Sequence, residues 1–99
     1  MAEHSRWEDV RDRAMTDPKT QEGYRAAQLA YELGIEVRRL RLEHGWSQSQ
    51  LAERAEMTQS AVARMELGGT TPTLPVLSRL ATAFDRRLTI CFESVEQPA

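Results

Sequence analysis

The chain has 99 residues, of which 40% are apolar and 28% are charged, and its formal net charge is −2 at pH 7. This length and composition fit one globular domain with at most one appended segment, and they exclude an intrinsically disordered chain. No apolar run is long enough to cross a membrane, and the polar N-terminus lacks the apolar core of a secretory signal. We therefore expect a cytoplasmic protein without membrane partners.

The charges are unevenly distributed along the chain. Residues 1–23 hold six acidic and four basic residues, whereas residues 24–92 hold nine arginines and seven acidic residues. A mildly basic middle between acidic ends can bind phosphate groups locally, although charge alone does not predict nucleic-acid binding here. Twelve of the 13 basic residues are arginine, whose forked guanidinium suits phosphate and guanine.

The first part of the chain predicts two helices of unequal length. Residues 7–15 can form a short helix, with Ser5 as the N-cap and Glu8 completing a capping box. From about Thr20 to His44, apolar residues recur at three- and four-residue steps, the pattern of one long helix. At about 1.5 Å per residue that helix would be roughly 37 Å long. The rest of so small a domain cannot cover this length, so we expect its first half to project or to pack against a partner.

Three shorter helices follow, and each begins at a hydroxyl side chain suited to capping a helix. The N-caps are Ser47, Thr58 and Thr73. The helices that they introduce are predicted over residues 48–55, 59–67 and 74–84. Gln50 stands three residues after Ser47, so these two residues can form a capping box. The side chains expected to face the core are Leu51, Ala52, Ala55, Val62, Met65, Leu77, Leu80, Ala81 and Phe84.

The C-terminal segment has the period-two alternation of a β-strand. Its apolar positions are Leu88, Ile90 and Phe92, and its intervening positions are Thr89, Cys91 and Glu93. Because one strand cannot form a sheet, we expect it to pair with its copy in a homodimer or with another protein. Cys91, the one cysteine of the chain, is then expected to be a buried structural thiol.

Residues 47–66 carry the most informative pattern in the chain. Two short capped helices are separated by a three-residue turn, with the small Ala52 where the helices would cross and the β-branched Val62 beneath the second helix. This spacing is typical of a helix-turn-helix, whose second helix can enter a DNA major groove about 12 Å wide. The alternative is a small helical bundle with an ordinary polar surface.

The outward residues of this pattern suit contact with DNA. Gln59 lies in the first turn of the second helix, where glutamine can pair with adenine, and Ala61 is small enough to touch a thymine methyl group. Arg64, one turn further on, can reach guanine or phosphate. Gln48 begins the preceding helix, where its side chain and backbone N–H can bind phosphate together. The full set of predicted DNA-binding residues is Gln48, Thr58, Gln59, Ser60, Ala61, Arg64, Thr70 and Thr71.

Residues 34–84 resemble the Cro/CI-type helix-turn-helix domain of phage repressors and of the xenobiotic-response-element family of regulators. A wider set of matches, over about 75 of the 99 residues, resembles HigA-type antitoxins of toxin–antitoxin modules. The wider resemblance is carried by Tyr24 and by residues 33–41, 47–48, 51–52, 59–66, 72–73 and 88–92. It implies an all-α helix-turn-helix bundle with an N-terminal helical extension and one C-terminal strand that pairs across a dimer.

The resemblance also implies roles for single residues. Gln48 would bind phosphate, and the residues facing the groove would be Gln59, Ser60 and Arg64. Arg41 and Glu66 would form a buried or half-buried ion pair between the first and third helices of the domain, a structural role in which paired hydrogen bonds fix orientation. The sequence departs from many relatives at Glu56, where they have glycine. Glu56 must therefore take an unfavourable backbone conformation or a different turn.

We interpret the chain as an N-terminal helical extension (1–33), a DNA-binding domain (34–84) and a dimerisation strand with its tail (85–99). The predicted function is that of an antitoxin that represses its own operon and neutralises a HigB/RelE-like mRNA-cleaving toxin. The alternative is a free-standing, phage-like repressor without a toxin. The enzyme of such a system would be the toxin, and these toxins are usually basic and sheet-rich. This chain is neither, so we expect that it is not an enzyme. We also expect no metal and no cofactor. His4 and His44 have no adjacent carboxylate–cysteine set that would suit a metal.

The toxin-binding surface is predicted within residues 1–33. Its expected residues are Trp7, Tyr24, Leu29 and Tyr31, which a solitary helix could not bury. Acidic residues in this segment would suit a basic partner that handles RNA, because charge complementarity speeds encounter and selects partners; they include Glu3, Glu8, Asp9, Asp12, Asp17 and Glu22. The alternative is that Tyr24 and Tyr31 pack on the last helix of their own chain or of a dimer mate.

Overall fold

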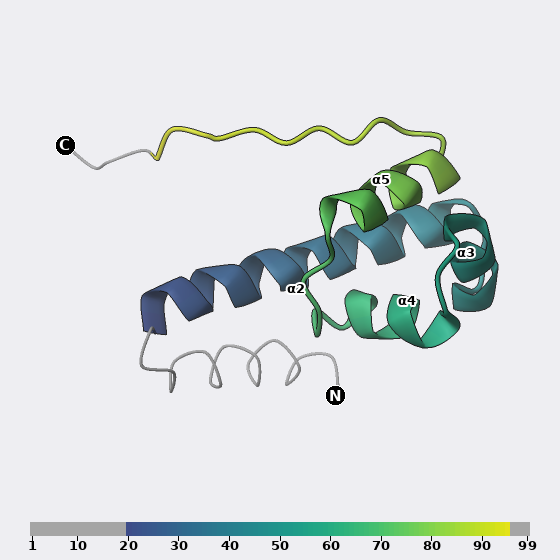
Figure 1. Cartoon of the computed structure of the whole chain (residues 1–99), viewed down its shortest axis with the longest axis horizontal. Coiled ribbons are helices and arrows are strands. Elements are labelled where there is room, and N and C mark those ends of the chain that lie inside the picture. Colours follow the sequence, from purple (N-terminus) through teal and green to yellow (C-terminus); the bar gives the residue numbers. More distant parts are fainter. Residues whose placement is uncertain (1–19, 96–99) are drawn as a thin grey trace.

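The computed structural model describes residues 20–95, and the short helix predicted over residues 7–15 lies outside them. Four helices follow one another in this part of the chain (Figure 1). They are α2 (Thr20–Glu43), α3 (Gln48–Ala55), α4 (Gln59–Glu66) and α5 (Leu74–Ala83). Their ends lie within one residue of the predicted ends, and no strand is present among residues 20–95, so the described chain is all-α. None of these four helices combines the length and the apolarity needed to cross a membrane.

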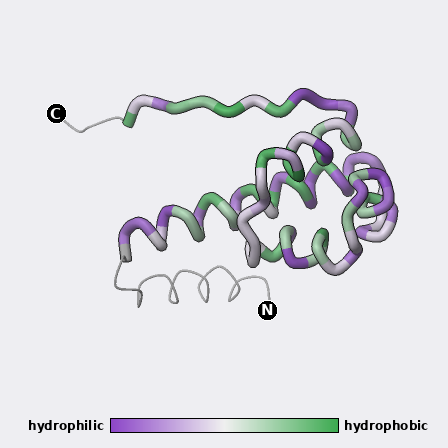
Figure 2. Tube along the Cα trace, in the orientation of Figure 1, coloured by the Kyte–Doolittle hydropathy of each residue, from purple (hydrophilic) through white to green (hydrophobic). Residues whose placement is uncertain are grey.

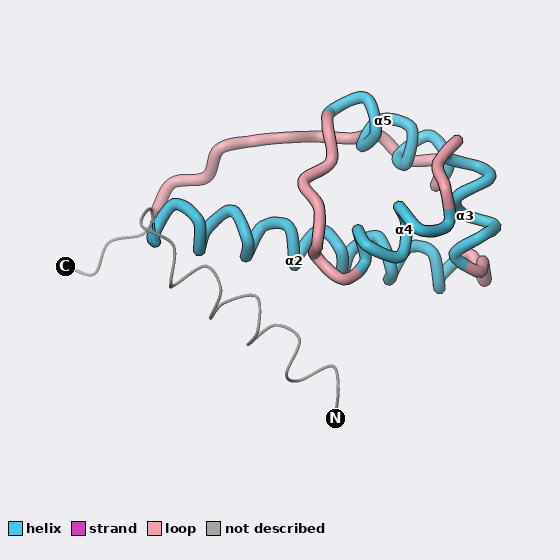
Figure 3. Tube along the Cα trace, turned by 60° about the horizontal axis from the view of Figure 1, so that its bottom comes forward, coloured by secondary structure: helices cyan, strands magenta, loops and turns pink. Residues whose placement is uncertain are grey.

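Among the described helices, α3, α4 and α5 cover the long helix α2 only along its second half. α4 packs against α2, and α3 packs against both α4 and α5. Burial along α2 begins at Gly34, whereas residues 21–33 are exposed or half-buried. The first half of α2 therefore projects from the bundle, as its predicted length required (Figures 1 and 3).

The core lies where α2, α3, α4 and α5 meet. Its buried apolar side chains are Val37, Leu40, Leu51, Ala52, Ala55, Val62, Met65, Leu80 and Phe84. Leu51 of α3 and Val62 of α4 are fully buried, and each side chain of this size contributes about 1.5–3 kcal/mol by leaving water. Leu77, predicted to face the core, packs against it while remaining half-buried. Ala81, also predicted to face the core, is half-buried, because α5 packs mainly on α3 and its other side stays open in the described chain.

The three short helices begin as their N-caps predicted. The Ser47 hydroxyl accepts from the Gln50 backbone N–H at 3.1 Å, and the Ser47 N–H donates to Gln50 Oε1 at 2.8 Å, so the capping box is complete. Thr58 and Thr73 each accept from the backbone N–H three residues later, at 3.0 and 3.5 Å. Since helix starts leave backbone donors without partners, these bonds explain where each helix begins.

The turn between α3 and α4 is closed by Glu56 in the left-handed region, with φ 57° and ψ 48°. The next N–H, that of Met57, donates to the Ala52 carbonyl at 2.8 Å, the bond that closes a helix C-terminus of this kind. Of the two outcomes open to a residue that is not glycine, Glu56 takes the strained one. A left-handed conformation costs such a residue about 1–2 kcal/mol.

Gly34 allows α2 and α4 to approach closely. A Cβ added at Gly34 would lie 2.5 Å from the Met65 carbonyl oxygen and 2.9 Å from the Glu66 carbonyl oxygen. Real Cβ atoms are not found so close to backbone oxygens, and these oxygens belong to the last turn of α4. A glycine is therefore required where the two helices cross.

The predicted C-terminal strand is not formed within residues 20–95. The last backbone hydrogen bond along the described chain joins the Arg86 N–H to the Ala81 carbonyl. Residues 87–95 take part in none. This segment runs as an extended loop (Figure 3), and Figure 2 shows hydrophobic stretches along it. Ile90 is 65% exposed and Phe92 fully exposed. Cys91, expected to be buried, is also exposed, because no neighbouring strand covers it in the described chain.

Candidate nucleic-acid interface

The starts of α3 and α4 are joined by a hydrogen bond between two side chains predicted to contact DNA. Gln59 Nε2 donates to Gln48 Oε1 at 2.7 Å. Gln59 is exposed and Gln48 half-buried, so the pair lies at the surface with Gln48 on the inner side. Eleven residues separate these glutamines in sequence, and the turn after α3 brings them together.

Both helix starts offer positive electrostatic potential to a phosphate group. The first turns of α3 and α4 contain no acidic residue. The N-terminal N–H groups of a helix point out of its start, and the helix dipole adds partial positive charge there. Because no carboxylate in either first turn offsets this charge, the paired helix starts are suited to binding the DNA backbone.

The remaining predicted contact residues of α4 lie on its accessible side. Thr58, Ser60 and Arg64 are exposed, and Ala61 is half-buried. The Thr58 hydroxyl accepts the Ala61 backbone N–H as the N-cap, and its own O–H remains able to donate to a phosphate oxygen. Arg64 forms no ion pair within residues 20–95, so its guanidinium is open to an external anion or base.

Thr70 and Thr71 lie in the loop between α4 and α5. This loop turns back on α4, because Gly69 N–H donates to the Arg64 carbonyl at 2.9 Å. Thr70 is half-buried and Thr71 exposed. In the described chain no hydrogen bond joins these threonines to Gln48 or Gln59, so they form a separate part of the candidate interface.

The ion pair implied by the resemblance lies directly behind the two glutamines. Arg41 Nε donates to Glu66 Oε2 at 2.6 Å, and Arg41 Nη2 donates to Glu66 Oε1 at 3.0 Å. The remaining terminal nitrogen, Nη1, donates to the Trp46 carbonyl at 2.8 Å. The side chains of Arg41 and Glu66 are 11% and 4% exposed. The hydrogen bond to Glu66 raises the pKa of Arg41, against the opposing effect of burial.

A third donor to Glu66 was missed by sequence reasoning. Gln48 Nε2 donates to Glu66 Oε1 at 3.1 Å, which connects the buried ion pair to the surface pair of glutamines. Eighteen residues separate Gln48 from Glu66, and neither stands at a spacing that marks a contact. Their contact follows from the packing of α3 on α4, which no local pattern reveals.

An aromatic cluster supports the turn between α2 and α3. The rings of His44 and Trp46 stack with centroids 4.3 Å apart, and Phe84, the C-cap of α5, stacks on both rings at 5.7 and 6.0 Å. The Arg54 guanidinium lies 4.4 Å from the Trp46 ring centroid, a cation–π distance. This cluster ties α3 and α5 to the end of α2 and thereby helps to hold Gln48 in place.

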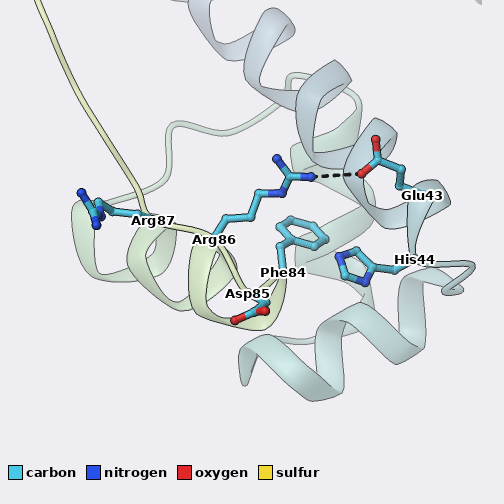
Figure 4. Close-up of a pocket in the computed structure, with 6 residues that line it drawn as sticks. All are labelled: Glu43, His44, Phe84, Asp85, Arg86 and Arg87. Carbon is cyan, nitrogen blue, oxygen red and sulfur yellow. Dashed lines mark hydrogen bonds and ion pairs between the residues drawn. The ribbon is translucent and has the colours of Figure 1, made fainter.

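A shallow depression at the end of α2 contains none of the predicted DNA-binding residues. Its lining residues are Glu43, His44, Phe84, Asp85, Arg86 and Arg87. Arg86 reaches across it to Glu43, with Nη2 and Oε1 3.2 Å apart (Figure 4). Arg39 also donates to Glu43, at 3.0 Å. These exposed contacts hold the start of the C-terminal segment at the end of α2, although each such pair is worth little by itself.

The predicted partner-binding residues lie on the projecting half of α2, apart from Trp7, which falls outside the described residues. Leu29 is 67% exposed, whereas Tyr24 and Tyr31 are half-buried. All three are separated in sequence from the helix starts that carry Gln48 and Gln59. The candidate DNA interface and the candidate partner surface therefore use different parts of the chain.

Comparison with known proteins identifies the fold of this region. A family model described as Helix-turn-helix (HTH_3) matches residues 37–90, which is more than half of the chain. No curated protein and no solved structure gives a significant match. The matched range covers the end of α2 from Val37 onward and all of α3, α4 and α5, so it includes every predicted DNA-binding residue. The chain therefore belongs to the HTH_3 helix-turn-helix family, and its bundle is a DNA-binding helix-turn-helix domain.

Proposed function

We propose that this protein is a transcriptional repressor that reads operator DNA with α4 in the major groove. The observation that carries the proposal is the contact between Gln48 and Gln59, which links two helix starts without acidic residues into one polar surface. Phosphate bound at Gln48 would set the position of α4, and Gln59 and Arg64 would then contact base edges. This division of work between backbone contacts and base contacts is how helix-turn-helix domains obtain sequence specificity.

The repressor is proposed to act as a homodimer formed through residues 87–93. Leu88, Ile90 and Phe92 alternate on an extended segment whose backbone groups have no partner within residues 20–95, and a two-fold copy of the same segment can pair them. Two copies of α4 would then contact half-sites about one helical turn, or roughly 34 Å, apart. The expected operator is a pseudo-palindrome.

Selection from a library of random duplex DNA tests the repressor proposal. The full-length protein should enrich a pseudo-palindromic motif whose half-sites are about one DNA turn apart. The same selection with Gln59→Ala should weaken the preference at one position in each half-site. If the wild-type protein binds DNA at the chosen salt concentration but enriches no motif, the proposal of sequence-specific DNA binding would be contradicted.

We further propose that the repressor is an antitoxin and not an enzyme, and that it neutralises an mRNA-cleaving toxin of the HigB/RelE type. The support is the exposed Leu29 on a helix half that the domain does not cover, together with the acidic character of residues 1–23. Exposed apolar side chains beside acidic ones suit a basic protein partner. Trp7, Tyr24 and Tyr31 would extend the same surface.

Rescue of cells that express the toxin encoded beside this chain tests the antitoxin proposal. Leu29→Glu should lose rescue while operator binding is unchanged. Gln28→Glu, a substitution at the neighbouring exposed position, is the matched control and should keep rescue. Rescue by Leu29→Glu at the wild-type level would show that Leu29 is not part of the toxin-binding surface. A neighbouring reading frame without any short basic toxin would instead favour a free-standing repressor.

A further inference from the structure

Four side chains form one continuous series of hydrogen bonds from the core to the start of α4. They are Arg41, Glu66, Gln48 and Gln59. Arg41 Nη2 and Gln48 Nε2 both donate to Glu66 Oε1, at 3.0 and 3.1 Å, and Gln59 Nε2 donates to Gln48 Oε1 at 2.7 Å. Each glutamine thus donates inward, toward the carboxylate.

The charge of Glu66 fixes this direction. An ionised carboxylate can accept hydrogen bonds but cannot donate them, so Gln48 must turn its NH2 group toward Glu66. The carbonyl oxygen of Gln48 is then presented to Gln59, which must in turn use its NH2 group. Glu66 cannot reorient, since its side chain is 4% exposed and Arg41 holds both of its oxygens.

The direction of the series decides which groups Gln59 offers to DNA. Bidentate pairing with adenine requires one donor for N7 and one acceptor for the N6 amino group. With one N–H bonded to Gln48, the Gln59 amide retains one N–H and its carbonyl oxygen for that base edge. A reversed amide would bond to Gln48 through its oxygen and would present two N–H groups instead.

We propose that Glu66 is a positioning residue for base readout: its carboxylate, acting through Gln48, orients the amide of Gln59. The inference rests on the proposed function, in which Gln59 contacts a base. Glu66→Gln keeps the size of the side chain but supplies a donor as well as an acceptor. Gln48 and Gln59 can then adopt either direction, so the base preference should fall even though the fold is kept.

The test measures base preference on a set of operator duplexes in which each base pair of the half-site is replaced in turn. Full-length wild type, Gln59→Ala, Gln48→Ala and Glu66→Gln are compared at one salt concentration, below the melting temperature of each. The position read by Gln59 is the one where Gln59→Ala loses preference. Gln48→Ala and Glu66→Gln should each lose about tenfold preference at that position and little at the others. Loss of a phosphate contact alone would weaken binding uniformly.

Arg41→Lys is the matched control, because it weakens the ion pair but leaves the Glu66 carboxylate facing Gln48. It should lower the melting temperature and keep the base preference. If Glu66→Gln does not fold, Gln48→Ala decides the matter by the same measurement. Wild-type preference retained in Gln48→Ala or in folded Glu66→Gln would overturn the inference and leave the proposed function standing. A wild-type protein without preference at any position would overturn both.

Discussion

Arg41 of α2 and Glu66 of α4 are joined by two hydrogen bonds, at 2.6 and 3.0 Å, across 25 residues of sequence. The pair is nearly buried, so each charge has lost most of its hydration and depends on the other. This relationship binds the helix proposed to read DNA to the long helix that supports it.

Arg41→Met should lower the free energy of unfolding by about 3–5 kcal/mol, because it leaves the Glu66 carboxylate buried without a counter-charge. The double variant Arg41→Met/Glu66→Leu should recover most of this loss, since it removes both charges. Urea denaturation followed by circular dichroism measures the free energy of unfolding of both variants. A cost below about 1 kcal/mol for Arg41→Met would show that Gln48 and water suffice to support the carboxylate.

Glu56→Gly should stabilise the domain by about 1 kcal/mol, because glycine adopts the left-handed conformation without strain. In a domain of this size that change corresponds to roughly 4–8 °C in melting temperature. Glu53→Gly is the matched control: it places a glycine within α3, where glycine costs about 1 kcal/mol. Thermal melts in which both variants lose stability would contradict the account of the turn.

Gly34→Ala should destabilise the domain by about 1–3 kcal/mol, the usual cost of overpacking, although alanine is the better helix former. The new methyl group would meet carbonyl oxygens of α4 that cannot move independently. Gly69→Ala serves as the control, because a Cβ there would lie 3.4 Å from the Arg64 oxygen, an ordinary contact. Chemical denaturation should separate the two variants, and equal stabilities would refute the close crossing of α2 and α4.

Ile90→Glu should convert the proposed dimer to a monomer, because it places a charge on the apolar face of the pairing segment. Thr89→Glu places the same charge on the opposite face and should leave more of the dimer intact. Sedimentation velocity at equal protein concentration measures the fraction of dimer in each variant. A dimer unaffected by Ile90→Glu would point to association through the helices.

The helices were predictable because their signals are local. Ser47 with Gln50, and the threonines at 58 and 73, stand next to the backbone groups that they cap, so sequence spacing alone locates each helix start. The exposed C-terminal segment could not be placed in the same way. Its alternation describes a strand, but a strand requires a neighbour, and the described chain supplies none.

The candidate site was predictable residue by residue but not as a connected unit. The sequence predicts Gln48 and Gln59 as contact residues because each stands in the first turn of a short helix. Their mutual hydrogen bond, and the bond from Gln48 to Glu66, depend on the angle at which α3 crosses α4. The fully buried Leu51 and Val62 belong to the core between these helices, and no local pattern specifies how such side chains pack.

The central claim is that α4 reads base sequence, and equilibrium binding to a selected operator and to a scrambled duplex of equal length tests it most directly. The wild-type protein should prefer the operator by at least about 10³-fold. Gln59→Ala and Arg64→Ala should each weaken operator binding by about 1–3 kcal/mol with helicity intact. Ser78→Ala, on the exposed surface of α5, should change neither affinity. Wild-type affinity for the operator in both α4 variants would show that another element reads the DNA.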